Sequence, residues 1–175
     1  MKNIIRSLLL FSAGLAVNSH ADSGAFIFGA LGQTSFKVIG QSASDTSYAL
    51  GGGYSFNKNF ALEARYDDFG AFSEDGYSFS SNAYGISLRA SLPVSDAVSL
   101  YGKVGLSFWE INDFKPYQSY SSTASESDNE LHYGLGGEFA VSQTLKLGAE
   151  YNMLNLSGFD DLDINTLAIF ARWNF

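Results

Sequence analysis

Residues 48–67 read YALGGGYSFNKNFALEARYD, and this stretch decides the fold. On each side of its centre, large apolar residues alternate with small, polar or charged ones. A period of two is typical of a β-strand with one apolar face. The segment Asn57-Lys58-Asn59 has the composition of a tight turn. The stretch therefore predicts two antiparallel strands joined as a β-hairpin.

The same alternation recurs along most of the chain. Further strands are predicted at 84–92, 98–109, 132–141, 145–153 and 166–175. A segment at 24–35, whose two faces the sequence leaves ambiguous, makes eight. The predicted connections alternate between short turns and longer polar segments, the latter near 36–46, 68–82, 112–130 and 157–164. Eight strands of about ten residues, with short turns at one end and long loops at the other, are typical of an outer-membrane barrel.

The composition excludes several other classes of protein. With 46% hydrophobic residues the chain is not intrinsically disordered, and its net charge of −8 argues against a nucleic-acid partner. The absence of cysteine excludes a disulfide, a thiolate metal site and a cysteine nucleophile. We expect one barrel domain over residues 22–175, without a cofactor or a metal ion.

The first 21 residues have the features of a signal peptide. Lys2 and Arg6 precede an apolar stretch at 8–17, and Ser19-His20-Ala21 fits a cleavage site. The alternative, a transmembrane helix, needs roughly 20 apolar residues, about twice what this stretch offers. We therefore predict export and cleavage after Ala21.

The solvent that each strand face meets distinguishes two kinds of barrel. A soluble, lipocalin-like barrel would hide its apolar face and expose its polar face to water. Here the polar face is mostly Gly, Ala and Ser, which suits the narrow interior of an eight-stranded barrel. The apolar face carries aromatic residues toward both strand ends, as interface girdles do. Predicted girdle residues are Phe56, Phe60, Phe139, Trp173 and Phe175 near the short turns, and Tyr48, Tyr66, Tyr84, Phe108, Tyr133 and Tyr151 toward the loops.

A sheet in lipid must close on itself, because lipid offers no hydrogen-bond partners. The predicted fold is therefore an all-β, eight-stranded antiparallel up-and-down transmembrane β-barrel.

Several short motifs, in this order, give the chain a family resemblance from Leu50 to Phe175. They are Gly52-Gly53-Tyr54, Glu63, Leu92-Pro93-Val94-Ser95-Asp96, Leu100-Tyr101-Gly102-Lys103, Trp109, Gly136-Gly137-Glu138-Phe139-Ala140, Glu150-Tyr151 and Trp173-Asn174-Phe175. The sequence resembles the OmpA-like transmembrane barrels of Gram-negative outer membranes.

The resemblance implies a monomer in the cell outer membrane, in contact with lipid and lipopolysaccharide. It also implies that the assembly machinery reads Trp173 and Phe175 as its signal. Longer family members continue into a peptidoglycan-binding domain, whereas this sequence ends at Phe175, so the resemblance does not imply tethering to the cell wall.

Charged residues on the polar face are the candidate functional site. They are Glu63, Arg65, Arg89, Lys103, Glu138, Lys146, Glu150 and Arg172. The resemblance implies that Glu63 and Glu138 pair with Arg89 in a central ion cluster. A family arginine falls on Gly148 here, so Lys146 or Arg172 is expected to supply that charge. Buried charges persist only when paired, and two interpretations stay open: a structural plug, or a small ion path gated by the cluster.

Acidic residues collect in the regions predicted as long loops. They are Asp67, Asp68, Glu74, Asp75, Asp113, Glu126, Asp128, Glu130, Asp160, Asp161 and Asp163. No loop has the ligand spacing of a calcium-binding hand, so solvated loops are expected rather than a dedicated metal site. Phe114, Tyr117 and Tyr120 in the third loop are candidates for contact with a surface partner.

A catalytic role requires a serine with a histidine base, as in lipid A deacylases and acyltransferases. Beyond the signal segment the chain has one histidine, His132, and it is followed by Tyr133 and Gly134 instead of the His-x-Ser arrangement. We therefore predict no catalytic residues and no enzyme, with a lipid A modifying enzyme as the remote alternative. The predicted function is a structural and surface-interaction barrel, with a small gated pore as the main alternative.

Overall fold

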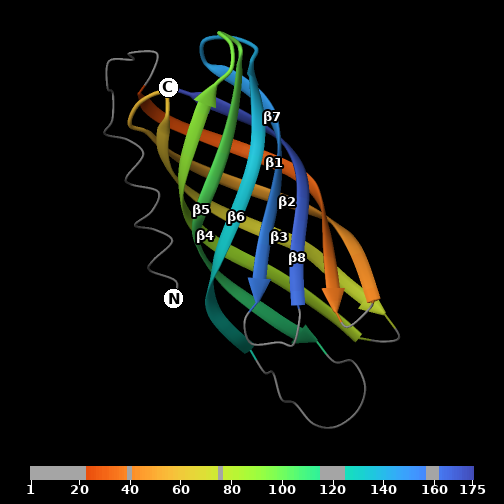
Figure 1. Cartoon of the computed structure of the whole chain (residues 1–175). Helices are drawn as coiled ribbons and strands as arrows, with labels where there is room; N and C mark the ends of the chain where they lie inside the picture. Colours follow the sequence, from red (N-terminus) through yellow and green to blue (C-terminus); the bar gives the residue numbers. More distant parts are fainter. Residues whose placement is uncertain (1–22, 39–40, 75–76, 115–124, 157–161) are drawn as a thin grey trace.

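A computed structural model describes residues 23–38, 41–74, 77–114, 125–156 and 162–175, and its eight strands form one closed antiparallel barrel in chain order. The strands are β1 (Gly24–Val38), β2 (Gln41–Ser55), β3 (Phe60–Glu74), β4 (Tyr77–Pro93), β5 (Val98–Phe114), β6 (Ser125–Ala140), β7 (Leu145–Leu156) and β8 (Leu162–Asn174). The short turns and the C-terminus lie at one end of the cylinder (Figure 1). The predicted strand number and the closed antiparallel topology are confirmed. Among the described residues, none belongs to a helix long and apolar enough to cross a membrane.

The three short turns share one hydrogen-bonding design. Each begins with a small polar residue: Asn57, Ser95 or Ser142. Its side-chain oxygen accepts hydrogen bonds from the backbone N–H groups two and three residues later, at 2.8–3.3 Å. Such side chains stabilise tight turns because they replace backbone acceptors. The turns thus fix the register at which each following strand begins.

The strands are longer than predicted and extend into segments that we expected to be loops. β3 continues to Glu74 and β4 starts at Tyr77, so most of the predicted loop at 68–82 is a paired hairpin. The pairing shifts between Asp68 and Ala71, where Gly70 has a φ of +88°. In this segment the alternation disappears from the sequence, although the backbone pairing continues. That loss of pattern made these extensions look like loops.

The two faces of β1, which the sequence left ambiguous, are resolved by its pairing with β2 and β8. Phe26, Ala30 and Thr34 are buried in the lumen, whereas Ile27 and Leu31 are 54% and 63% exposed. On the other strands most of the large apolar side chains likewise face outward. Lipid is therefore the environment that would solvate this surface.

Inside the barrel, apolar side chains form two clusters. The first, called the apolar layer below, lies toward the end away from the short turns and comprises Phe69, Ala83, Trp109, Leu154 and Ile164. The second lies deeper in the barrel and comprises Ala30, Ala49, Tyr101, Ala168 and Phe170. The charged side chains occupy the rest of the lumen.

Candidate functional site

All eight charged residues of the predicted site point into the lumen. Seven are at most 7% exposed, and only Lys146 is half-buried. They come from β3 (Glu63, Arg65), β4 (Arg89), β5 (Lys103), β6 (Glu138), β7 (Lys146, Glu150) and β8 (Arg172). The structure arranges them in two clusters, whereas the resemblance implied one.

The turn-side cluster, nearer the short turns, is centred on Glu138. Arg89 lies 2.5 Å from one Glu138 oxygen through Nη2, and Lys146 Nζ lies 2.9 Å from the other. Arg89 also reaches Glu63 at 3.2 Å, and Arg172 reaches Glu138 at 3.8 Å. Both candidate replacements for the family arginine therefore contact the same carboxylate.

Two arginines of this cluster also lie against aromatic rings. The guanidinium of Arg89 sits 3.6 Å from the ring centre of Tyr101, and that of Arg172 sits 3.6 Å from the ring centre of Phe26. Arg172 donates a further hydrogen bond to Ser55 Oγ at 2.7 Å. Cation–π contacts of desolvated groups add to the ion pairs and hold each guanidinium in one orientation.

Gly148, where the family places an arginine, has no room for a side chain. A Cβ added there would lie 2.6 Å from Cε1 of Phe170 on the neighbouring strand. The Phe170 ring packs edge-on against Tyr101, with 6.2 Å between ring centres. The departure from the family pattern is thus compensated by a large side chain on β8.

The loop-side cluster, toward the other end of the barrel, is centred on Glu150. Lys103 Nζ lies 2.7 Å from one Glu150 oxygen and Arg65 Nη1 lies 2.9 Å from the other. Asn152 donates a hydrogen bond to Glu150 at 2.9 Å. Arg65 also makes two bonds with Asp67, at 2.6 and 2.7 Å. Asp67 had been assigned to the acidic rim, and this assignment is wrong because its side chain faces inward beside Arg65.

Tyr101 joins the two clusters, although it was not among the predicted site residues. Its ring lies under Arg89, and its hydroxyl donates to Glu150 at 3.0 Å. Gly136 on the adjacent strand provides the space, since a Cβ there would lie 2.5 Å from the tyrosine Cζ and Oη. A large ring on a small-residue face, opposite a glycine, is the sequence signal that could have identified it.

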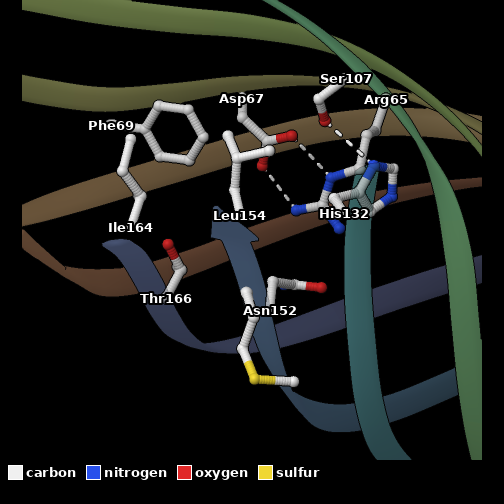
Figure 2. A pocket seen from close by; sticks show the side chains of 10 residues that line it. Arg65, Asp67, Phe69, Ser107, His132, Asn152, Leu154, Ile164 and Thr166 are labelled. Atoms are coloured by element: carbon white, nitrogen blue, oxygen red, sulfur yellow. Dashed lines mark hydrogen bonds and ion pairs between the residues drawn. The ribbon is translucent and has the colours of Figure 1, made fainter. Parts of the chain in front are cut away.

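His132 lies beyond the loop-side cluster, beside a small cavity. Its Nδ1 lies 3.0 Å from Ser107 Oγ, and the side chain is 5% exposed. The cavity has a volume of about 20 Å³, and its wall also includes Asn152 and Leu154 (Figure 2). About 10–15 Å³ suffices for one water molecule. The apolar layer borders this cavity, because its residues Phe69, Leu154 and Ile164 also line the cavity wall.

The described charges of the two clusters are nearly balanced, with five cations against four carboxylates once Asp67 is included. Each cation lies within 4 Å of at least one carboxylate. Removing one partner from a buried pair costs about 3–5 kcal/mol, because the other charge is left uncompensated. The arrangement is therefore chemically suited to filling and stiffening the lumen.

The predicted girdle residues lie on the outer face. Tyr66 is half-buried. The other ten are 42–59% exposed, and they are Tyr48, Phe56, Phe60, Tyr84, Phe108, Tyr133, Phe139, Tyr151, Trp173 and Phe175. The rings of Tyr66 and Tyr84 lie 5.1 Å apart on adjacent strands, and the Tyr48 hydroxyl donates to Asp68 at 2.7 Å.

Several predictions fall on parts of the chain that the structure does not describe. The signal segment 1–21 is one of them. The others are the side chains of Glu74, Asp75, Asp113, Phe114, Tyr117, Tyr120, Glu126, Asp128, Asp160 and Asp161. The proposed contact with a surface partner therefore rests on sequence alone.

An outward apolar surface around a polar, ion-paired lumen defines an integral outer-membrane β-barrel protein. The outer membrane protein beta-barrel domain family matches residues 7–175, and the chain belongs to this family. Its place is the outer membrane of a Gram-negative bacterium.

Comparison with individual proteins agrees with this family. The chain is 29% identical to outer membrane protein P5 of Haemophilus influenzae over 182 residues, which cover 87% of this chain and 51% of that protein. The chain thus spans about half the length of this relative.

Solved structures share the fold at low sequence identity. Neisserial surface protein A superposes with a TM-score of 0.75 at 16% identity, over 87% of this chain and 99% of that one. Ail, the attachment invasion locus protein of Yersinia pestis, solved with the heparin analogue sucrose octasulfate, gives 0.67 at 20% identity, over 88% and 99%. The outer membrane enzyme PagL gives 0.55 at 15% identity, over 86% and 99%. The fold is therefore shared by surface proteins and by an enzyme, and does not by itself determine function.

Proposed function

We propose that this barrel has a structural and surface-interaction role, with its loops as the contact region for an external partner. The observation that carries the proposal is the lumen, which is filled by two ion-paired clusters and an apolar layer. We infer that these described side chains leave no continuous polar path through the lumen, so that the outer surface is the part able to act. Ail and Neisserial surface protein A, named for attachment and for the surface, support this role by analogy.

Potassium flux from proteoliposomes tests the closed lumen. Vesicles carrying the wild-type protein are expected to hold a potassium gradient as long as protein-free vesicles do. The Arg89→Ala variant, which loses two carboxylate contacts, is expected to hold it too, because the apolar layer remains. Rapid loss of the gradient with the wild-type protein would contradict the proposal.

The second candidate function is a small pore gated by the turn-side cluster. It is supported by the sharing of Glu138 among three cations, of which Arg172 is the most distant at 3.8 Å and Lys146 the most exposed. Such a carboxylate has alternative partners, and exchange between them could open a water path. A leak present in wild type and increased in Arg89→Ala would favour this candidate.

An enzymatic role on lipid is the least supported candidate. His132 faces the lumen and contacts Ser107 there, away from the lipid-facing surface that an acyl chain would reach. We infer that the protein does not modify lipid A. Mass spectrometry of lipid A from cells with wild-type protein or His132→Ala should give identical profiles, and a profile that changes with the variant would contradict this inference.

We also propose that the signal peptide is cleaved after Ala21 and that the girdle residues anchor the resulting monomeric barrel in the membrane. We further propose that the assembly machinery recognises Trp173 and Phe175 as its signal. Trp173 and Phe175 are outward and 47% and 59% exposed, so they are accessible to a partner. Phe175→Ala should lower the amount of barrel in the outer membrane, with accumulation in the periplasm. Leu147→Ala, at an outward position of similar exposure outside the girdle, is the control and should assemble normally.

A further inference from the structure

The small cavity beside His132 lies where the loop-side cluster meets the apolar layer. Its wall includes Arg65 and Asn152 on the polar side and Leu154 on the apolar side (Figure 2). The function proposed above does not involve this cavity. Its volume of about 20 Å³ exceeds the 10–15 Å³ that one water molecule needs, so a ligand of that size fits and a larger one does not.

Two buried polar atoms beside the cavity have no hydrogen-bond partner among the described residues. They are His132 Nε2 and Asn152 Oδ1. The other polar atom of each side chain is bound, since His132 Nδ1 lies 3.0 Å from Ser107 Oγ and Asn152 Nδ2 donates to Glu150 at 2.9 Å. Buried polar atoms that the protein leaves unpaired are ordinarily bound by ordered water, because an unmade hydrogen bond is costly.

Inward glycines on three neighbouring strands provide the space for these two side chains. A Cβ at Gly105 would lie 2.6 Å from His132 Cε1, and a Cβ at Gly85 would lie 3.3 Å from the same atom. A Cβ at Gly134 would lie 2.6 Å from Asn152 Oδ1. The sequence therefore keeps room for the imidazole and for the amide oxygen at this point of the lumen.

The chemistry of the wall selects the ligand. Asn152 Oδ1 only accepts hydrogen bonds, so it requires a donor and disfavours an anion. Arg65 uses three of its five N–H groups on Asp67 and Glu150, which leaves two that can donate. A metal cation would lie beside the positive Arg65, and the described part of the chain holds no group of three or more metal-binding side chains. Water both donates and accepts, and a buried water molecule makes about three hydrogen bonds.

We propose that this cavity is a binding site for one ordered water molecule, which bridges His132 Nε2 and Asn152 Oδ1 and accepts a hydrogen bond from Arg65. Beyond Asn152 the chain of hydrogen bonds continues to Glu150, the centre of the loop-side cluster. Beyond His132 it continues to Ser107 on β5. The water thus links β7, β6 and β5 and extends the loop-side cluster toward the apolar layer.

Nuclear magnetic resonance tests the site on the wild-type protein, purified without a histidine tag and reconstituted in nanodiscs with EDTA. Magnetisation should pass from water to the ring C–H protons of His132, whose signals are identified by their loss in His132→Phe. In Asn152→Leu, which removes one acceptor and fills the cavity, this transfer should be lost. Leu154→Val is the matched control, because it changes only the apolar wall, and it should keep the transfer.

Three results would overturn the proposal. Absence of transfer in the wild-type protein would mean a dry cavity. Equal transfer in Asn152→Leu would mean that the protons come from a neighbouring hydroxyl or N–H group. A shift of the His132 ring signals when Zn²⁺ replaces EDTA would identify a metal site instead.

Heat-modifiable migration on gels verifies that each variant is folded. Should Asn152→Leu not fold, a crystal structure of the wild-type protein decides. It must show an ordered water within hydrogen-bonding distance of both His132 Nε2 and Asn152 Oδ1, and a cavity without that water would reject the proposal.

Discussion

Glycines on the inner and outer faces of the barrel differ in how much space a side chain would have at their positions. Inward glycines leave space for a large neighbour: a Cβ at Gly136 would lie 2.5 Å from Tyr101, and one at Gly134 would lie 2.6 Å from Lys103 Cε. An outward Cβ at Gly137 would lie 3.4 Å from Leu100, close to ordinary contact. The inward glycines are thus part of the charged site, although they carry no functional group.

The adjacent positions 136 and 137 make a matched pair of variants. Gly136→Ala should lower the free energy of unfolding by about 1–3 kcal/mol, because it overpacks the lumen at Tyr101. Gly137→Ala should be nearly neutral, since its new methyl group faces lipid. Urea unfolding in lipid vesicles, followed by tryptophan fluorescence, measures both. Equal losses at the two positions would contradict the different roles of the two faces.

The loop-side cluster allows a second prediction, based on its central carboxylate. Glu150→Gln should lower the free energy of unfolding by about 3–5 kcal/mol, because buried Lys103 and Arg65 lose a common counter-charge. Arg65 retains Asp67, so Lys103 carries most of the penalty. The double variant Glu150→Gln, Lys103→Met should therefore recover part of the stability. A double variant as unstable as the sum of the two single variants would show that the pair is not coupled.

At the scale of elements, the sequence predicted most strands because lipid and lumen impose a strict alternation. The hairpin at 48–67, the later strands and the three turns all follow from that period of two. The strand ends on the loop side could not be predicted, because the alternation is lost there in the sequence although the backbone pairing continues. β1 stayed ambiguous because both faces carry large and small residues, and only pairing with β2 and β8 distinguishes them.

The candidate site was only partly predictable from sequence. Alternation placed the eight charged residues inside, but it carries no information on which charges meet across the lumen. The division into two clusters depends on Tyr101, and the inward position of Asp67 depends on β3 extending past the expected loop boundary. Contacts between strands distant in sequence require the closed barrel.

The turns provide a prediction at this scale. Ser142→Ala removes an acceptor for two backbone N–H groups and should cost about 1 kcal/mol in unfolding free energy. Gln143→Ala, at the next residue, is the control, and its side chain is exposed. Equilibrium urea unfolding of the two variants compares them directly. A larger loss for Gln143→Ala would show that the shared turn design does not contribute to stability.

For the whole molecule, the lumen contains two kinds of obstacle in series along the barrel axis. Ion-paired side chains occupy its turn-side and middle parts, and the apolar layer lies on the loop side. Hydrophobic constrictions exclude water and ions by dewetting. The apolar layer is therefore expected to block ions even when a salt bridge is lost.

This arrangement predicts a non-additive effect on conductance. Arg89→Ala alone and Trp109→Ala alone should each leave the barrel closed, whereas the double variant should conduct, because both obstacles are then weakened. Heat-modifiable migration on gels serves as the control for a folded barrel in every variant. Conduction by Arg89→Ala alone, equal to that of the double variant, would show that the apolar layer is no barrier.

Single-channel recording of the wild-type protein in planar bilayers tests the closed lumen most directly. A folded barrel, verified by its gel mobility and inserted at high protein-to-lipid ratio, should give a current indistinguishable from that of the protein-free bilayer. Reproducible conductance steps in the wild-type protein, with an amplitude that changes in Arg89→Ala, would contradict the account and identify the barrel as a gated pore.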